Sequence, residues 1–195
     1  TSMGYQAPDG TYPNKMRLRY IMSNQAVLGG EYHLGSYLHF SAEGFYKSYS
    51  SYPISELEGI SLASKGTEYG QVGAEAVLST GEGRAYGAEV VARLMPWHQF
   101  SATATYTLFQ SEFTDKAGIY RPSSWDTRQM LNLLLSYRLG KSWHLSASWR
   151  YSGGAPYTPI DMELSTNKVA WAVTNRAYPD YTRFNTLRLP AKHQL

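Results

Sequence analysis

The sequence predicts an all-β protein whose antiparallel strands form a segment of a transmembrane β-barrel. Three observations support this prediction: polar and apolar residues alternate along several segments, tight turns alternate with long connections, and aromatic residues gather at both ends of the apolar face. Side chains of a strand alternate between its two faces, so this pattern gives each strand one apolar and one polar face. A membrane barrel needs an apolar band between two aromatic girdles.

The clearest hairpin covers residues 128–152. Its first strand turns leucines to one face and Asn132, Ser136 and Arg138 to the other. A tight turn at Gly140 follows, and the second strand again alternates, with Trp143 and Trp149 on the apolar face. Period-two alternation on both sides of a short turn is the pattern of a β-hairpin with one apolar face.

The same unit occurs twice more. One hairpin covers about residues 25–49 with its turn at Gly35, and another covers about residues 86–110 with its turn at 95–98. Residues 16–20 also alternate, which predicts a strand there, and Leu187 and Leu189 begin a further alternation near the end. Together these segments predict about six or seven strands, with another strand beginning where the chain stops.

Long connections occupy one end of the hairpins, at about residues 50–85, 111–127 and 153–186. Loops of this length are unusual in compact soluble domains, whereas outer-membrane barrels combine short periplasmic turns with long extracellular loops. The outward residues between the aromatic belts carry no charge: Phe40, Ala42, Val90, Ala102, Ala104, Leu133, Leu135, Leu145 and Ala147. A charge at mid-bilayer costs about 2–4 kcal/mol, so this gap favours a membrane wall.

The composition excludes several classes of function. The chain has 195 residues and no cysteine, which argues against a disulfide scaffold and a thiol nucleophile. A net charge of +3 is too small to indicate a nucleic-acid partner. The histidines lack the spacing of metal ligands, and the serines beside His144 lack a nucleophile elbow. No apolar run is long enough for a transmembrane helix. We therefore predict no cofactor, no metal and no enzymatic activity.

Candidate ligand-contacting residues fall into two groups. Charged residues on the inward face would line the lumen: Glu43, Glu89, Arg93, Arg138 and Arg150. Aromatic residues in the long loops suit sugars or flat chelates: Trp125, Tyr157 and Trp171, together with Tyr52, Tyr69 and Tyr178. The alternatives are that the first group forms ordinary ion pairs in the wall and solvates the lumen, and that the second group packs within the loops.

Five segments, taken in order, resemble TonB-dependent outer-membrane receptors, especially those of Bacteroidetes-type bacteria. They include Gly-Arg-Ala-Tyr-Gly-Ala-Glu at 83–89 and Arg-Pro-Ser-Ser-Trp-Asp-Thr-Arg at 121–128, and the others are 43–47, 151–159 and 185–190. The resemblance spans about residues 24–195 and implies a barrel of about 22 strands with a plugged lumen. It also implies import of a scarce nutrient (an iron chelate, cobalamin or a glycan), with energy delivered through TonB.

In this family residues 1–195 would be a late part of the barrel domain, without the plug and the last strands. The implied partners are the remainder of the barrel and the plug, TonB through an N-terminal region absent from this sequence, lipid of the bacterial outer membrane, and for glycan receptors a surface lipoprotein. An open sheet cannot sit alone in lipid because its edge groups lack partners. Transport therefore belongs to the parent protein.

Two other functions stay open at this point. A passive porin or an adhesin-like barrel would share the wall but lack the plug and the energy coupling. A soluble all-β binding domain with long loops would share the strands, although an uncharged apolar face of this extent is rare on a soluble protein.

Overall fold

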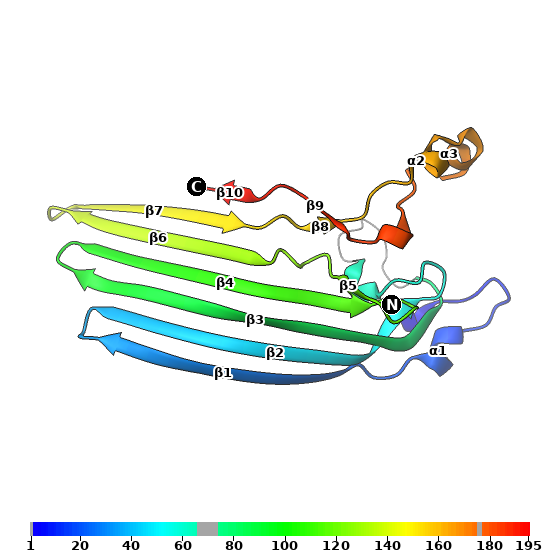
Figure 1. The fold of residues 1–195 in the computed structure, drawn as a ribbon, viewed down its shortest axis with the longest axis horizontal. Helices are drawn as coiled ribbons and strands as arrows, with labels where there is room; N and C mark the ends of the chain where they lie inside the picture. The colour runs from blue at the N-terminus through cyan, green and yellow to red at the C-terminus, as the bar shows by residue number, and fades with distance from the viewer. Residues whose placement is uncertain (1, 66–73, 175–176) are drawn as a thin grey trace.

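One long antiparallel sheet dominates the computed structural model, which describes residues 2–65, 74–174 and 177–195. Its strands lie side by side in the order β1-β2-β3-β4-β6-β7-β10 (Figure 1). Their bounds are β1 Met22–Leu34, β2 Leu38–Ser55, β3 Val77–Trp97, β4 Phe100–Thr114, β6 Gln129–Leu139, β7 Trp143–Ser152 and β10 Lys192–Gln194. The sheet thus has the antiparallel hairpin architecture that the sequence predicts.

The shorter elements gather at the end of the sheet that carries the long connections (Figure 1). Strand β5 pairs with β4, and β8 pairs with β9 in a separate small sheet. The bounds are β5 Tyr120–Pro122, β8 Pro156–Tyr157, β9 Leu187–Arg188, α1 Pro13–Arg17, α2 Met162–Thr166, α3 Lys168–Thr174, η1 Ser2–Gly4, η2 Leu62–Ser64 and η3 Tyr181–Arg183. Within the described part of the chain, every helix is too short or too polar to cross a membrane.

The three tight turns lie together at the opposite end of the sheet (Figure 1). Gly35 and Gly140 occupy two of them with φ of 61° and 64°, a conformation that glycine adopts without a steric cost. The third turn differs from the prediction, because β3 continues to Trp97 and the chain reverses at His98. A register shift between Leu94 and Trp97 lets the strand pass Pro96, which has no N–H to donate.

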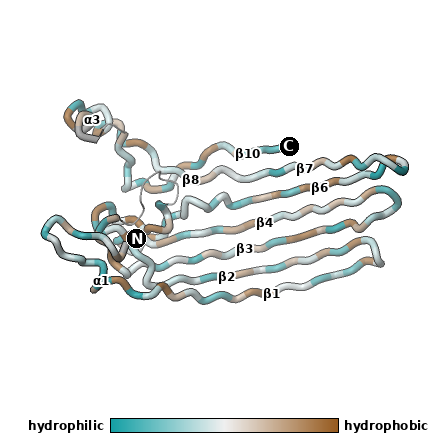
Figure 2. The backbone as a smooth tube through the Cα atoms, turned by 180° about the vertical axis from the view of Figure 1, so that it is seen from behind, coloured by the Kyte–Doolittle hydropathy of each residue, from teal (hydrophilic) through white to brown (hydrophobic). Residues whose placement is uncertain are grey.

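The strand register confirms the predicted faces. Ala42 lies opposite Val90, Ala104 lies opposite Leu133, and each of these pairs belongs to the apolar face. One position along, Glu43 lies opposite Glu89 on the polar face. Hydrophilic and hydrophobic residues accordingly alternate along the strands in Figure 2. A slip of one residue would exchange the two faces, so the shared pattern fixes the register.

Residues 16–20 do not form the predicted strand. Helix α1 covers part of this segment, and β1 begins only at Met22. Pro13 starts the helix, a position that its fixed φ favours. Asn14 is fully buried, donates to the carbonyl of Glu75 at 2.8 Å and accepts from the N–H of Val77 at 3.0 Å. These tertiary contacts outweigh the local alternation. Near the other end, Leu187 lies in β9, which pairs with β8 in the small sheet, and the strand that joins the large sheet, β10, begins only at Lys192 and pairs with β7.

The buried apolar residues lie at the long-loop end: Ile54, Ile60, Leu62, Val77, Phe113 and Phe184. We call the described residues of 50–82, 111–128 and 153–189 the rim, and residues 22–49, 83–110 and 129–152 the wall. Register shifts after Tyr49 and Tyr52 mark the boundary between them on β2, and Ser51 has a φ of 59° there. Beyond this bulge Tyr52 packs against the ring of Phe113, at 4.8 Å between centroids.

Candidate functional site

The polar face of the wall carries all five charged residues that the sequence singles out. Glu43 and Glu89 are directly opposed on β2 and β3, and Arg93 lies opposite His39. Arg138 lies opposite His144, and Arg150 opposite Asn132. The ladder continues from strand to strand, so these positions belong to one face even though they come from four strands.

The acidic part of this face lies on β1, β2 and β3. Glu31, Glu43 and Glu89 border a shallow groove of about 400 Å³. The Glu89 carboxylate accepts a hydrogen bond from the Thr107 hydroxyl at 2.9 Å. Like charges that face one another across a strand pair destabilise a sheet. This part of the wall therefore favours a cationic or hydrogen-bond-donating neighbour above it.

The basic part lies on β6 and β7. Arg138 donates from Nε to His144 Nε2 at 3.2 Å, and Arg150 borders a small groove beside Asn132. Among the residues that the structure describes, the ion pairs do not include any of the five predicted charges. The polar face of the wall therefore carries Glu43 and Glu89 together with Arg93 on β2 and β3, and Arg138 and Arg150 on β6 and β7.

The loop aromatics divide into exposed and packed residues. Trp125, Tyr157 and Trp171 are 63%, 39% and 48% exposed, so their rings are open to solvent at the long-loop end. Tyr52 is packed against Phe113 instead, which fits the alternative of loop packing. Tyr178 is partly buried, and its N–H donates to the hydroxyl of Ser165. Tyr69 lies outside the described residues.

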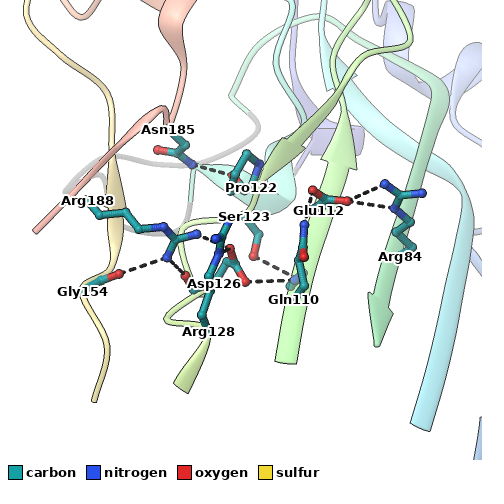
Figure 3. Close-up of polar contacts among 11 residues, drawn as sticks. Arg84, Gln110, Glu112, Pro122, Ser123, Asp126, Arg128, Gly154, Asn185 and Arg188 are labelled. Carbon is teal, nitrogen blue, oxygen red and sulfur yellow. Dashed lines mark hydrogen bonds and ion pairs between the residues drawn. The ribbon is translucent and has the colours of Figure 1, made fainter. Parts of the chain in front are cut away.

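A buried carboxylate, that of Asp126, holds several segments of the rim together (Figure 3). Its Oδ2 accepts from Arg188 Nη2 at 2.5 Å, and its Oδ1 accepts from the Ser111 N–H at 3.1 Å. Arg128 Nε lies 3.8 Å from the same Oδ2. Charge-assisted bonds of this kind compensate the cost of burying a carboxylate. One side chain therefore joins the ends of β4 and β6 to β9.

Glycine and asparagine allow the loops of the rim to approach closely. A Cβ on Gly154 would lie 1.6 Å from the carbonyl oxygen of Leu189, so only glycine fits there. Arg188 also donates to the carbonyl of Gly154 at 3.1 Å. Asn185, with a φ of 52°, is buried and donates to the carbonyl of Pro122 at 2.8 Å (Figure 3). The segment before β9 is thus bonded to the last residue of β5.

A second ion pair lies at the end of the apolar face that borders the rim. Arg84 donates to Glu112 from Nε at 2.8 Å and approaches it with Nη2 at 2.7 Å (Figure 3). Gln110 donates to the other carboxylate oxygen of Glu112 at 2.6 Å. The Arg84 guanidinium also lies over the Tyr120 ring, 4.1 Å from its centroid. Glu112 is buried, so this pair is shielded from water.

A third polar cluster surrounds Lys65, whose side chain is buried. Its ammonium forms ion pairs with Glu58 and with Glu75, the latter at 2.6 Å. Burial of the ammonium opposes the charged form, but the hydrogen bonds from Lys65 to both carboxylates outweigh it and raise the Lys65 pKa above its ordinary value of 10.5. The charged form is therefore stabilised within the rim.

Asp126, Arg188 and Lys65 were not among the residues that the sequence analysis singled out. The segment 121–128 contributed only to the family resemblance, and nothing local distinguishes Asp126 from an exposed loop carboxylate. Its main partner, Arg188, lies 62 residues further along the chain. A signal for this site would be the combination of an aspartate shortly before one strand with an arginine within another.

Comparisons with known proteins support the fold. No protein-family model matches the chain, and no curated protein matches it. The structure is similar to the crystal structure of the ferripyoverdine receptor of the outer membrane of Pseudomonas aeruginosa bound to ferripyoverdine, with 15% sequence identity and a TM-score of 0.54. The match covers 81% of this chain and 20% of that chain, so this chain spans about a fifth of the receptor's length. The likeness confirms the predicted fold class, a stretch of antiparallel barrel wall.

Proposed function

We propose that this chain is part of a TonB-dependent transporter in a bacterial outer membrane. In this proposal residues 1–195 belong to one barrel domain, and the complete protein imports a scarce nutrient such as an iron chelate, cobalamin or a glycan. The observation that supports it best is the two-sided wall, whose continuous apolar face lies back to back with a charged face. The likeness to a fifth of an outer-membrane receptor supports the same assignment.

Exposure of the apolar face favours a membrane over water. Leu28 is 84% exposed, and Leu145 and Leu135 are 53% and 43% exposed on the same face. A soluble domain would cover such a patch with a second layer. In a barrel these residues contact lipid, and the opposite face, with Glu43, Glu89 and Arg150, lines the lumen.

Partners follow from the edges of the sheet and from the lumen. Strand β1 lies at one end of the strand order, and its outer N–H and C=O groups need a neighbouring strand inside a bilayer. The remainder of the barrel supplies it. The charged residues of the polar face, acidic and basic, suit contact with a plug domain and its ligand. Trp125, Tyr157 and Trp171 suit contact with the ligand from the extracellular side, and in a glycan receptor a surface lipoprotein would lie above them.

The test uses the complete polypeptide that contains this sequence. We expect it to require detergent for purification, and we expect cells to accumulate its ligand only when TonB is present. Passage that continues without TonB would instead indicate a passive porin-like barrel. A monodisperse monomer in the absence of detergent would indicate a soluble binding domain and would contradict the membrane assignment.

A further inference from the structure

A shallow groove crosses the apolar face of the wall where β1, β2, β3, β4 and the start of β6 lie side by side. Its volume is about 1180 Å³, larger than the other hollows described above. Neighbouring strands lie about 4.8 Å apart, so a groove across five strands is about 19 Å long. This length suits an extended chain better than a small ion.

Small residues form the floor of the groove. Gly44 and Ala88 lie opposite each other, and Leu28 and Leu108 continue the same row on either side. A Cβ on Gly44 would meet no atom nearer than 3.9 Å, and its φ does not lie in the left-handed region. Neither the backbone nor the packing therefore requires glycine at this position. The missing side chain leaves open space over the floor of the groove.

Aromatic residues place one side of the groove at the membrane interface. Tyr46 and Tyr86 stack with their ring centroids 6.4 Å apart and border the groove on the side of the rim. Tyrosine is enriched at the level of the lipid headgroups. The leucine row then lies deeper in the hydrocarbon layer, and residues beyond the tyrosines lie among the headgroups.

The headgroup end of the groove is positively charged. Arg84 and Arg128 both line it. Glu112 pairs with Arg84, but Asp126 is shared by Arg188 at 2.5 Å and Arg128 at 3.8 Å. Three arginines thus face two carboxylates, and the Arg128 side chain, 53% exposed, carries the excess charge.

The backbone of Arg128 holds this charge in place at a conformational cost. Its φ is 64°, which is uncommon for a residue with a side chain. The carbonyl of Arg128 accepts a hydrogen bond from the Phe109 N–H at 2.9 Å, which fixes the residue against β4. Strained residues of this kind persist where the surrounding structure or a binding role maintains them.

We propose that this groove binds a lipid with an anionic phosphate headgroup, with an acyl chain over Gly44 and Ala88 and the phosphate at Arg128. The proposal rests on the proposed function, because the apolar face must contact a membrane. Arginine binds phosphate oxygens through paired N–H donors, and the uncompensated charge favours an anion over a zwitterion. The apolar floor explains why the occupant is a lipid and not a free phosphate.

The chain offers a matched pair of variants. Gly44→Leu fills the groove, whereas Gly30→Leu adds the same side chain to the same face outside it. A Cβ on Gly30 would meet nothing within 4 Å, and one on Gly44 nothing nearer than 3.9 Å, so neither position is crowded at the backbone. Arg128→Gln removes the charge at the headgroup end. The buried Asp126 keeps its bonds to Arg188 and to the Ser111 N–H, so the rim stays folded in this variant.

The experiment is native mass spectrometry of the complete, delipidated polypeptide in neutral detergent, titrated with dioleoylphosphatidic acid. We expect one tightly retained lipid, with affinity reduced about tenfold by Gly44→Leu and by Arg128→Gln, and unchanged by Gly30→Leu. Dioleoylphosphatidylcholine should bind about tenfold more weakly, because its headgroup has no net charge. Inorganic phosphate should not displace the lipid.

Several results would overturn the inference. Equal affinity in Gly44→Leu and the parent protein would exclude the acyl groove, and equal affinity in Arg128→Gln would exclude the phosphate contact. Displacement by inorganic phosphate would indicate an anion site without a lipid. If the polypeptide needs no detergent, the proposed function fails before any lipid is added. If it inserts into membranes but shows no difference between the variants, this inference alone fails.

Discussion

The wall and the rim are stabilised in different ways. In the rim, Ile54, Val77 and Asp126 have at most 1% of their surface exposed, and their contacts come from the chain itself. In the wall, Leu28 and Leu145 are 84% and 53% exposed, although they belong to the most regular strands of the molecule. The difference shows that the rim closes on itself, whereas the wall holds its shape through backbone ladders and leaves both faces for other molecules.

This contrast predicts that the largest loss of stability follows removal of a buried charged side chain in the rim. Asp126→Ala should destabilise the rim by about 3–5 kcal/mol, because Arg188 would lose its buried counter-ion. Hydrogen exchange of residues 111–128 and 185–189 in the complete protein would measure the loss. Asp9→Ala, at an exposed carboxylate that accepts hydrogen bonds from the nearby Thr11, is the control and should change stability by less than about 0.5 kcal/mol. Equal effects from both substitutions would contradict the network around Asp126.

The free-energy cost of a charged residue in the wall should depend only on which face of the sheet carries it. Val90→Arg puts a cation on the apolar face and should cost about 2–4 kcal/mol of folding free energy in a bilayer. Val91→Arg changes the next residue, which borders the groove with Glu43 and Glu89, and should be close to neutral. Urea titration of the reconstituted protein in vesicles compares the two variants. Equal costs for the two variants would contradict the assignment of one face of the wall to lipid and of the other to the lumen.

Alkaline pH should loosen the rim before it affects the wall. The Lys65 pKa is raised in the folded protein, so the stabilisation is complete below the ordinary value of 10.5 and is lost as pH rises through the higher folded value. The effect is smaller than deletion of a charge, because the neutral amine keeps its two partners. Proteolytic cleavage in the rim, followed across alkaline pH, measures it. Lys65→Arg should flatten the profile, while Lys141→Arg, at a tight turn, should leave it unchanged.

The smallest effect should be equal in the two regions. Gly140 in the wall and Gly118 in the rim have φ of 64° and 80°, and a Cβ on either would meet nothing within 4 Å. Substitution by alanine should therefore cost about 1–2 kcal/mol at each, from backbone conformation alone. Thermal unfolding of both variants checks this. A clearly larger loss at one glycine would mean that its turn has contacts beyond the backbone geometry.

The wall could be predicted from the sequence because its information is local. Alternation with a period of two identifies a strand and its faces from neighbouring residues, and Gly35 and Gly140 mark the turns. The inward position of Glu43, Glu89, Arg93, Arg138 and Arg150 followed from that alternation. Whether these five residues contact a ligand stays a prediction. Strand register fixes the face of the sheet on which they lie, but it does not show whether a ligand binds there.

The rim could not be predicted in the same way because its contacts join distant segments. Asn14 reaches Glu75 and Val77 across 61 and 63 residues, and this is why α1 replaces the strand predicted at 16–20. Asp126 and Arg188 are separated by 62 residues. The residues that neighbour Asp126 and Arg188 in the sequence indicate neither the burial of these side chains nor their pairing. Sequence reasoning therefore found the exposed Trp125 but missed the carboxylate beside it.

The bulge on β2 between Tyr49 and Ile54 has a consequence for how such a protein can change over generations. An insertion or deletion in the loop after β2 alters residues beyond the bulge, where pairing with β3 is already irregular. The regular ladder from Leu38 to Tyr49 keeps its partners, because register on the wall side does not depend on loop length. Loop sequence and loop length can therefore diverge over generations, while the regular ladder of the wall is inherited unchanged.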